Sequence, residues 1–344
     1  MMDKKSLIFI SVSIAILIVM LYFVGIDRII TILKRANVYL IVLAVVVQIV
    51  TYFLYTLRWN IINDAADIKI SFKNLLPIVM VGLAVNNITP SGRGGGEPVR
   101  AYILSKQYNY RIKDTFATVV TDRVLDTFPF LVLAVITIFS MIIYFKVALW
   151  LVIVMILAVI GIIGLLAVIV YMSVNISFGS RVEGWIVNLV SKFRKKDLDK
   201  VEKRVHEFIS GFQDNMKILI SNKKVLYYTV PLSFLIWIFE ILRVYIVFSA
   251  FGTSLSFVVI SEVFIVASLV GMIPLLPGGL GAVDGLMAFL YSKAGIALSL
   301  TAPITIIERL ISFWMATFIG LIIIPYYGAS VLEKISLSSQ SVDD

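Results

Sequence analysis

The chain has 344 residues, of which 60% are apolar, and its mean hydropathy is +1.01. Soluble globular proteins have an apolar share of about 45–50%, so this composition predicts an integral membrane protein. The formal net charge is +9, which in a membrane protein indicates cytoplasmic loops and contacts with an anionic lipid surface; we expect no nucleic-acid partner.

Cysteine is absent, and His206 is the only histidine. This excludes disulfides and thiolate metal sites, and it argues against multi-histidine metal sites and His-dependent catalytic triads. We therefore expect neither a cofactor nor a metal ion. His206 lies in a charged amphipathic stretch, and we interpret it as a solvated helix position.

Six stretches are long and apolar enough to cross a hydrocarbon layer of about 30 Å as helices. They are residues 7–24, 38–57, 127–145, 147–172, 225–250 and 300–327. Two further apolar runs, 75–85 and 263–276, are too short to cross and contain proline and glycine, which is typical of re-entrant or broken helices. We predict an all-α polytopic membrane protein with about six full spans and two re-entrant or broken helices.

Each short run leads into a motif rich in proline and glycine. These residues predict backbone turns or gates at Pro90, Gly94, Gly95 and Gly96 in the first motif and at Pro277, Gly278, Gly279 and Gly281 in the second. The first motif also carries Arg93, Glu97 and Arg100, and the second is followed by Asp284. Because unpaired charges near lipid are expensive, we expect these side chains to have partners.

The two motifs belong to an internal repeat, since sliding the sequence along itself by about 187 residues aligns several features in order. The aligned pairs are Pro90 with Pro277, Gly92 with Gly279, Gly94 with Gly281, Glu97 with Asp284, Asp122-Arg123 with Glu308-Arg309, and Arg58 with Arg243. We predict one integral membrane domain over 1–344. Its parts are repeat 1 at about 38–145, a basic amphipathic segment at 173–224, repeat 2 at about 225–327 and a polar tail at 328–344.

Counting the crossings predicts that the two repeats are inverted, with the amino terminus and the central basic segment cytoplasmic. The first motif is surrounded by five basic residues, whereas the second has only Lys293 nearby, as expected if the first motif is cytoplasmic. Arg28, Lys34 and Arg35 disagree, because this topology places them outside.

Asp122-Arg123 and Glu308-Arg309 are adjacent pairs, so on a helix their side chains point about 100° apart and need partners from other helices. One arrangement has Arg123 and Arg309 facing Glu97 and Asp284, or a lipid phosphate, in a central cavity. The alternative is that these are structural pairs that lock the bundle. Our candidate head-group site comprises Arg93, Glu97, Arg100, Asp122, Arg123, Asp284, Glu308 and Arg309.

The run from Pro90 through Arg93, Gly96, Glu97 and Arg100, followed by Asp122-Arg123 and the later glycine motif at 276–281, resembles the transmembrane region of the lysylphosphatidylglycerol synthase and flippase family. The resemblance covers nearly the whole chain. It implies a polytopic bundle with two re-entrant elements that moves a charged phospholipid between leaflets. Some family members carry a cytosolic aminoacyltransferase; no such domain follows Tyr327, so we expect this chain alone not to synthesise an aminoacyl lipid.

The leading hypothesis is a lipid translocase of the cell membrane that moves an anionic or zwitterionic phospholipid, or a lipid-phosphate carrier, between leaflets. A second is a membrane-embedded transferase for aminoacyl or glycosyl groups, with Glu97 or Asp284 as general base. A third is a transporter of a small solute or ion. A lipid substrate and a separate lipid-modifying enzyme are the expected partners, and the oligomeric state stays open.

Overall fold

The computed structural model describes residues 31–340, apart from 32, 90–93, 145–148, 194–197, 273–278 and 280. This part of the chain contains helices and connecting loops and no strands, which confirms an all-α protein. Five stretches are long and apolar enough to cross a membrane, so the prediction of an integral, multi-pass protein also holds. The expected first span, 7–24, lies outside the described residues.

Long helices form the body of the bundle. They are α3 (Val38–Ala65), α6 (Ile112–Tyr144), α7 (Leu149–Val174), α10 (Lys223–Ala250) and a continuous stretch of α13 (Leu298–Arg309), η2 (Leu310–Trp314) and α14 (Met315–Gln340). The helix α14 continues through most of the segment 328–344, for which the sequence predicted only a polar tail. Segment 329–340 contains few helix breakers, which explains the extension.

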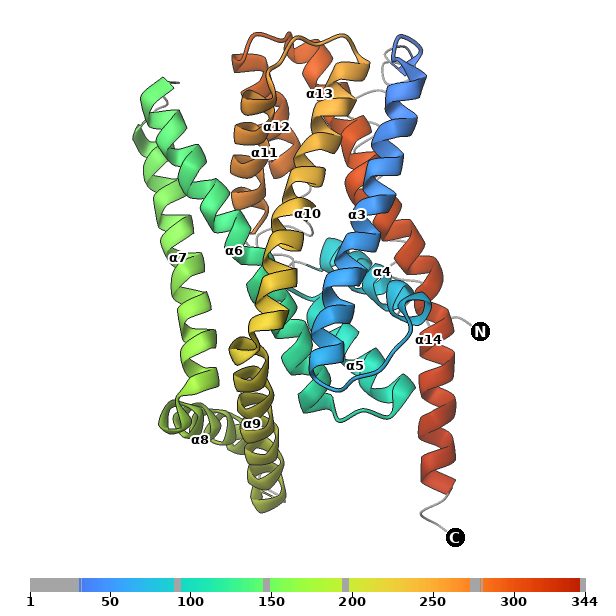
Figure 1. The fold of residues 1–344 in the computed structure, drawn as a ribbon, viewed down its shortest axis with the longest axis vertical. Coiled ribbons are helices and arrows are strands. Elements are labelled where there is room, and N and C mark those ends of the chain that lie inside the picture. Colours follow the sequence, from blue (N-terminus) through green and yellow to red (C-terminus); the bar gives the residue numbers. More distant parts are fainter. Residues whose placement is uncertain are drawn as a thin grey trace.

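Two hairpins of shorter helices fill the space between the long ones. The first consists of α4 (Phe72–Ile88) and α5 (Gly96–Tyr108), and the second of α11 (Phe257–Gly271) and α12 (Ala282–Lys293). Figure 1 shows that the first hairpin occupies the lower half of the bundle and the second the upper half. The inner ends of the hairpins therefore approach each other near mid-height.

Close backbone packing holds the first hairpin together. A Cβ atom at Gly96 would collide with the carbonyl oxygen of Gly82, so the crossing of α4 and α5 requires glycine there. The Gly96 amide also donates a hydrogen bond of 2.6 Å to Asn86 Oδ1. This contact supplies a partner for one of the amide groups left open at the start of α5.

The two halves of the chain make equivalent local contacts. Asn37 begins α3 by accepting a hydrogen bond from the Tyr39 amide at 3.0 Å, and Asn222 begins α10 by accepting one from the Lys224 amide at 3.1 Å. Thr115 Oγ1 donates to the carbonyl of Ala101 at 3.0 Å, and Thr301 Oγ1 donates to that of Ala288 at 2.9 Å. These matched positions follow the spacing of the sequence repeat.

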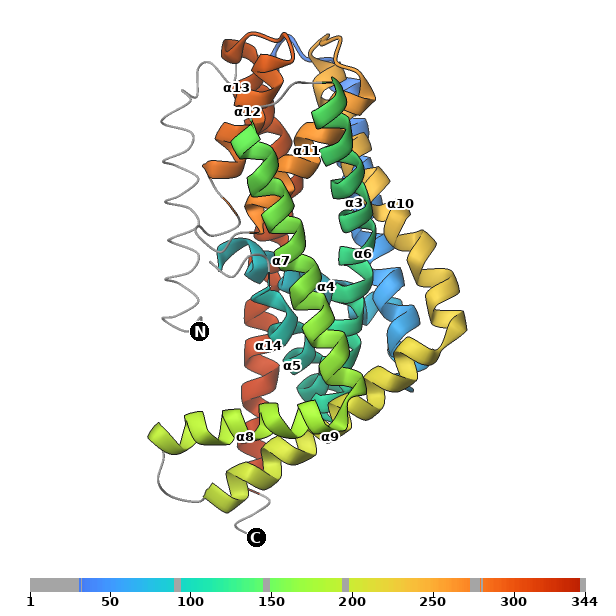
Figure 2. The same cartoon turned by 90° about the vertical axis from the view of Figure 1, so that its left-hand side faces the viewer.

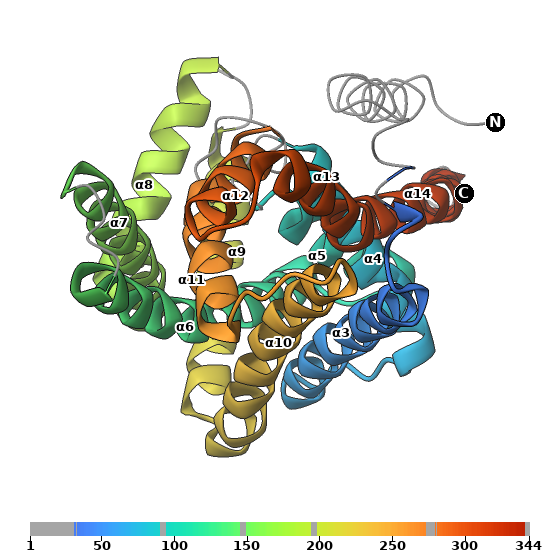
Figure 3. The ribbon, with the colours of Figure 1, turned by 90° about the horizontal axis from the view of Figure 1, so that it is seen from above.

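Equivalent helices of the two halves run in opposite directions. In Figure 1, α3 runs from top to bottom and its counterpart α10 from bottom to top. The α5–α6 connection lies at the lower end, whereas the equivalent α12–α13 connection lies at the upper end. Seen from above in Figure 3, α3 and α10 lie side by side, and they pack against each other along the bundle.

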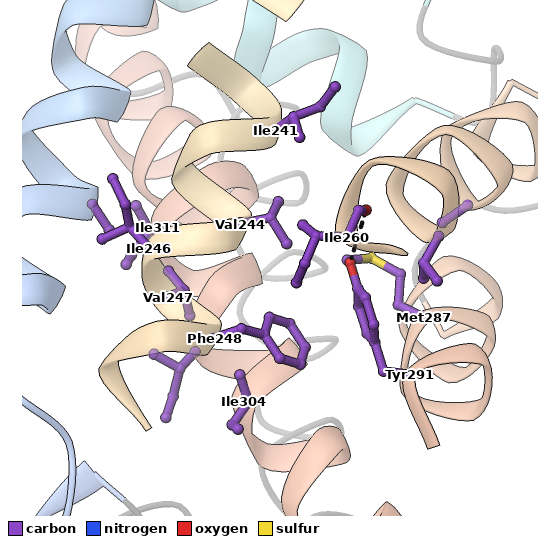
Figure 4. Close-up of a cluster of buried hydrophobic side chains, with 14 of the residues drawn as sticks. Ile241, Val244, Ile246, Val247, Phe248, Ile260, Met287, Tyr291, Ile304 and Ile311 are labelled. Carbon is purple, nitrogen blue, oxygen red and sulfur yellow. Dashed lines mark hydrogen bonds between the residues drawn. The ribbon is translucent and has the colours of Figure 1, made fainter. Parts of the chain in front are cut away.

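A large apolar cluster packs α10 against the second hairpin and α13, as Figure 4 shows. Val244 and Phe248 of α10 meet Ile260 of α11 and Ile304 of α13. Tyr291 of α12 lies in the same cluster with its ring 4.3 Å from that of Phe248, and its hydroxyl donates to the carbonyl of Ile260 at 3.4 Å. In a membrane protein such a cluster stabilises the bundle through van der Waals packing between helices, since lipid is as apolar as these side chains.

The central segment forms two amphipathic helices, α8 (Ile176–Phe193) and α9 (Leu198–Ser221). Figure 2 shows α8 turning away from the axis of α7 at the lower end of the bundle. The helix α9 packs on α6: the ring of Phe116 lies 5.6 Å from that of Phe208, and Asn215 Nδ2 donates to Asp114 Oδ1 at 2.8 Å. The predicted helix in this segment is therefore present and attached to the first half.

Single cysteines on the two connections test the opposed arrangement of the halves. We expect Arg111→Cys, beside the α5–α6 connection, and Ser299→Cys, beside the α12–α13 connection, to face opposite sides of the membrane. In sealed vesicles of one orientation a membrane-impermeant maleimide should label only one of them, and after permeabilisation it should label both. The parent chain has no cysteine and provides the blank. Equal labelling of both sites in sealed vesicles would contradict the arrangement.

Candidate functional site

A cavity of about 160 Å³ lies between the two halves. Its walls combine residues of the long helices with residues of both hairpins, including Glu97 of α5 and Met287 of α12. The charged residues lining it are five arginines and five acids: Arg58, Arg100, Arg123, Arg243, Arg309, Glu97, Asp122, Asp126, Glu240 and Glu308. A cavity that is charged within a bundle of apolar helices is the candidate functional site.

Arg58 of α3 is the centre of the ion pairs in the first half. Its Nε lies 2.7 Å from Asp122 Oδ1 and its Nη1 lies 2.8 Å from Asp126 Oδ1, both on α6. The same guanidinium donates to Ser233 Oγ on α10 at 3.1 Å. Arg58 is only 2% exposed, so these three bonds offset the cost of removing its charge from water.

Asp122 also binds a second arginine. Both terminal nitrogens of Arg100 donate to Asp122 Oδ2 at 3.0 Å, so the carboxylate lies between the guanidinium groups of Arg58 and Arg100. The guanidinium carbon of Arg100 lies 4.0 Å from the centre of the Trp59 ring, a cation–π contact. Arg100, which we expected to capture an anion, is therefore already bound to a carboxylate.

Arg243 of α10 repeats this pattern in the second half. Its Nη2 lies 2.7 Å from Glu308 Oε1 on α13, and it also contacts Glu240 one turn earlier on its own helix. Glu308 is the counterpart of Asp122 in the sequence repeat. Arg243 therefore binds one acid on another helix and one on its own.

The two central arginines connect the halves reciprocally. Arg58 of α3 donates to Ser233 of α10, and Arg243 of α10 donates to Gln48 of α3. Ser233 and Gln48 occupy equivalent positions, each ten residues before the arginine of its own helix. Each half therefore supplies the last polar partner for the buried arginine of the other.

A second type of ion pair links each hairpin to a long helix. Arg309 Nε lies 2.8 Å from Asp284 Oδ1, while Asp284 Oδ2 accepts a hydrogen bond of 2.7 Å from the Gly281 amide. In the first half, Arg123 Nη1 lies 4.0 Å from Glu97 Oε1. The arrangement in which Arg123 and Arg309 face Glu97 and Asp284 is therefore observed, with a tight pair in the second half and a loose one in the first.

The loose pair borders polar atoms that lack partners among the described residues. Glu97 Oε2 and Arg100 Nε are buried and make no hydrogen bond in that part of the chain. Arg123 is the most exposed of the five cavity arginines, with 30% of its side chain accessible. The first half thus offers both an acceptor and a donor to a molecule entering the cavity.

The structure brings together every predicted head-group residue that it describes, since Asp284 contacts the cavity residue Arg309. Arg93, Pro90, Pro277 and Gly278 lie outside the described residues. Of the predicted turn glycines, Gly279 and Gly281 have φ angles of +69° and +79°, a backbone conformation that favours glycine. Gly94 and Gly95 precede α5, and Gly96 begins it.

The predicted site omitted Arg58, Arg243, Asp126, Glu240 and Gln48. The sequence did contain a signal for the two arginines, because the internal repeat aligns Arg58 with Arg243. Asp126 had a weaker one, since it lies one helical turn after Asp122 on the same face. Gln48 had none, because its counterpart in the repeat is a serine.

These features define a polytopic helical membrane protein with a charged cavity inside the bundle. The chain belongs to the family of the lysylphosphatidylglycerol synthase transmembrane region, whose family model matches residues 7–320, and this confirms the resemblance seen in the two motifs.

Curated relatives carry names without an activity. A UPF0104 membrane protein of Methanothermobacter thermautotrophicus is 46% identical over 334 residues, which cover 97% of this chain and 99% of that protein. A UPF0104 membrane protein of Methanocaldococcus jannaschii is 32% identical, with 92% of this chain and 94% of that protein covered.

Removing the charge of Asp122 tests whether the arginine network supports the fold. We expect Asp122→Asn to lower the free energy of unfolding by about 3–5 kcal/mol, because two buried guanidinium groups lose their shared carboxylate. Thermal unfolding in detergent measures the change. The control is Asp64→Asn, whose partner Lys69 lies 3.3 Å away with both side chains exposed, and we expect its effect to be below about 1 kcal/mol. Equal midpoints for both variants would contradict a central role of Asp122.

Proposed function

We propose that the protein is a lipid translocase that moves phospholipids, or a related lipid phosphate, between the leaflets of the cell membrane. The observation that carries this proposal is the charged cavity between two half-length hairpins of opposite direction. Opposed repeats with broken helices near mid-membrane are a recurrent architecture of alternating-access transporters. Family membership is consistent with this proposal, while the names of the relatives leave the activity open.

The charges of the cavity suit a polar head group better than a bare hydrocarbon ligand. Its described walls carry as many arginines as acids, so a head group enters by exchanging with existing ion pairs. The loose pair of Glu97 and Arg123 is the easiest to exchange, because its atoms are 4.0 Å apart. In our proposal Arg123 binds the lipid phosphate, while Glu97 contacts a cationic or hydroxyl group beside it.

The tight pair of the second hairpin has a different role in this proposal. Asp284 is bound both by Arg309 and by the Gly281 amide, so it holds the start of α12 in place. Rupture of this pair would release the second hairpin, as a gate requires. The first hairpin then provides head-group binding and the second provides gating.

The helices α8 and α9 provide the contact with the membrane surface in this proposal. Trp185 of α8 is 67% exposed, and α8 turns away from the axis of α7 at the lower end of the bundle, as an interfacial helix would. The excess of basic residues in segment 173–224 fits an anionic cytoplasmic surface. Together with the expected first span, 7–24, this orientation gives a cytoplasmic amino terminus.

Leaflet-resolved transport in proteoliposomes tests the function and the site together. We expect the wild-type protein to move a head-group-labelled anionic or zwitterionic phospholipid between leaflets. Arg123→Ala and Glu97→Gln should each lower the rate about ten- to hundredfold, since a charge-assisted hydrogen bond contributes about 1.5–3 kcal/mol.

The matched control is Arg111→Ala, which removes an arginine that is exposed and bonded to Asp114 outside the cavity. Its rate should equal that of the wild type. Equal rates in all four proteins, with folding intact, would refute the assignment of the site. Transport no faster than in protein-free vesicles would refute lipid translocation.

A further inference from the structure

Glu262 of α11 is a buried carboxyl group that does not line the central cavity. The residue is only 4% exposed. Among the described residues its side chain has one polar contact, with Ser140 of α6, whose hydroxyl donates to Glu262 Oε1. The α11 helix therefore carries an ionisable group on the face that packs against α6.

The partners of Glu262 differ from those of the other buried acids. Asp122, Asp284 and Glu308 are the other buried carboxyl residues of the described chain, and each lies within 3.0 Å of an arginine nitrogen. No ion pair involves Glu262 in that part of the chain. Glu262 has a neutral hydroxyl group where the others have a cation.

The surroundings of Glu262 are apolar. The next residues on its helix face, Ile265, Val266 and Leu269, pack in one cluster with side chains of α6 and α7. The cluster partners are Phe130, Ala134, Ile138 and Met141 of α6 and Val152, Met155 and Val159 of α7. An ionised carboxylate at this place would lose its hydration without gaining a counter-charge from the described residues.

The other charged groups on the helices that pack on α11 contact other partners or lie far from Glu262. The helix α7 has none, and the last one on α6 is Asp126, about 20 Å along the helix axis from Ser140. Lys293 of α12 lies over the Phe289 ring at 5.5 Å. The remaining groups are Lys113, Asp114, Asp122 and Arg123 of α6, Lys223, Lys224, Glu240 and Arg243 of α10, and Asp284 of α12.

We propose that Glu262 is a proton-binding site, occupied while the α11–α12 hairpin packs on α6 and emptied when the hairpin moves away. In the packed state the O–H bond of the neutral acid is intact and Ser140 bonds to its carbonyl oxygen. When the hairpin separates, water reaches the group, the O–H bond breaks and the proton passes to water. Binding and release of a proton at Glu262 are thereby coupled to the movement of the hairpin.

The same helix connects this site to the cavity. Ala267, Ser268 and Met272 line the cavity at the other end of α11, and Ser268 lies about 9 Å along the helix from Glu262. Movement of α11 as a rigid body would therefore change the packing of Glu262 and the shape of the cavity together. This inference does not depend on which molecule the cavity transports.

Infrared difference spectroscopy of the purified protein at neutral pH tests the proposal without any substrate. The wild type should show the C=O stretching band of a protonated carboxylic acid, which shifts when glutamate is labelled with ¹³C. Glu262→Gln should lose this band. Ser140→Ala should keep it and shift it to higher frequency, because the hydrogen bond to the carbonyl oxygen is gone.

The matched control is Glu207→Gln, which removes a carboxyl group on α9 and should leave the band unchanged. The glutamine of Glu262→Gln resembles the neutral acid in shape, so this variant should fold. If it does not fold, the ¹³C shift of the wild-type band and the frequency shift in Ser140→Ala still test the proposal. A wild-type protein without the band would overturn the proposal. So would a band that persists in Glu262→Gln.

Discussion

Buried arginine–carboxylate pairs are the constraint on which this structure depends. Arg58 and Arg243 lie almost completely inside a bundle whose outer surface is apolar, where a cation without partners would be strongly destabilising. Each arginine therefore links its own helix to a second long helix of the same half. It also links its own helix to one residue of the opposite half. The geometry of α3, α6, α10 and α13 follows from these bonds, and the cavity is the space between them.

The two halves share this framework but differ where the hairpins meet it. Arg309 binds Asp284 at 2.8 Å, whereas Arg123 lies 4.0 Å from Glu97. Because the two halves are equivalent, a second state can exist in which the Arg123–Glu97 pair is tight and the Arg309–Asp284 pair is open. Alternating access needs two states of this kind, and the structure would then represent one of them.

The membrane-spanning helices, the half-length helices and the internal repeat could be predicted from the sequence, because hydropathy and glycine–proline motifs are local signals. The sequence also indicated that Asp122-Arg123 and Glu308-Arg309 need partners from other helices, since adjacent side chains on a helix diverge. The network around Arg58 was not predictable to the same degree. Its partners lie on α6 and α10, far along the chain, and the equivalent of Gln48 is Ser233, so neither spacing nor residue type reveals the contact. The continuation of α14 into the polar tail had only a weak local signal, the scarcity of helix breakers in 329–340.

The central claim of the proposed function is that lipid head groups enter the charged cavity between the two halves. Photo-crosslinking with two phospholipid probes tests it most directly, one with the reactive group on the head group and one with it at the end of an acyl chain. The account predicts that the head-group probe labels peptides around Arg123 and Ser312, and that the acyl-chain probe labels the exposed apolar face of α7. Head-group labelling confined to the ends of the helices, with none in the cavity, would contradict it.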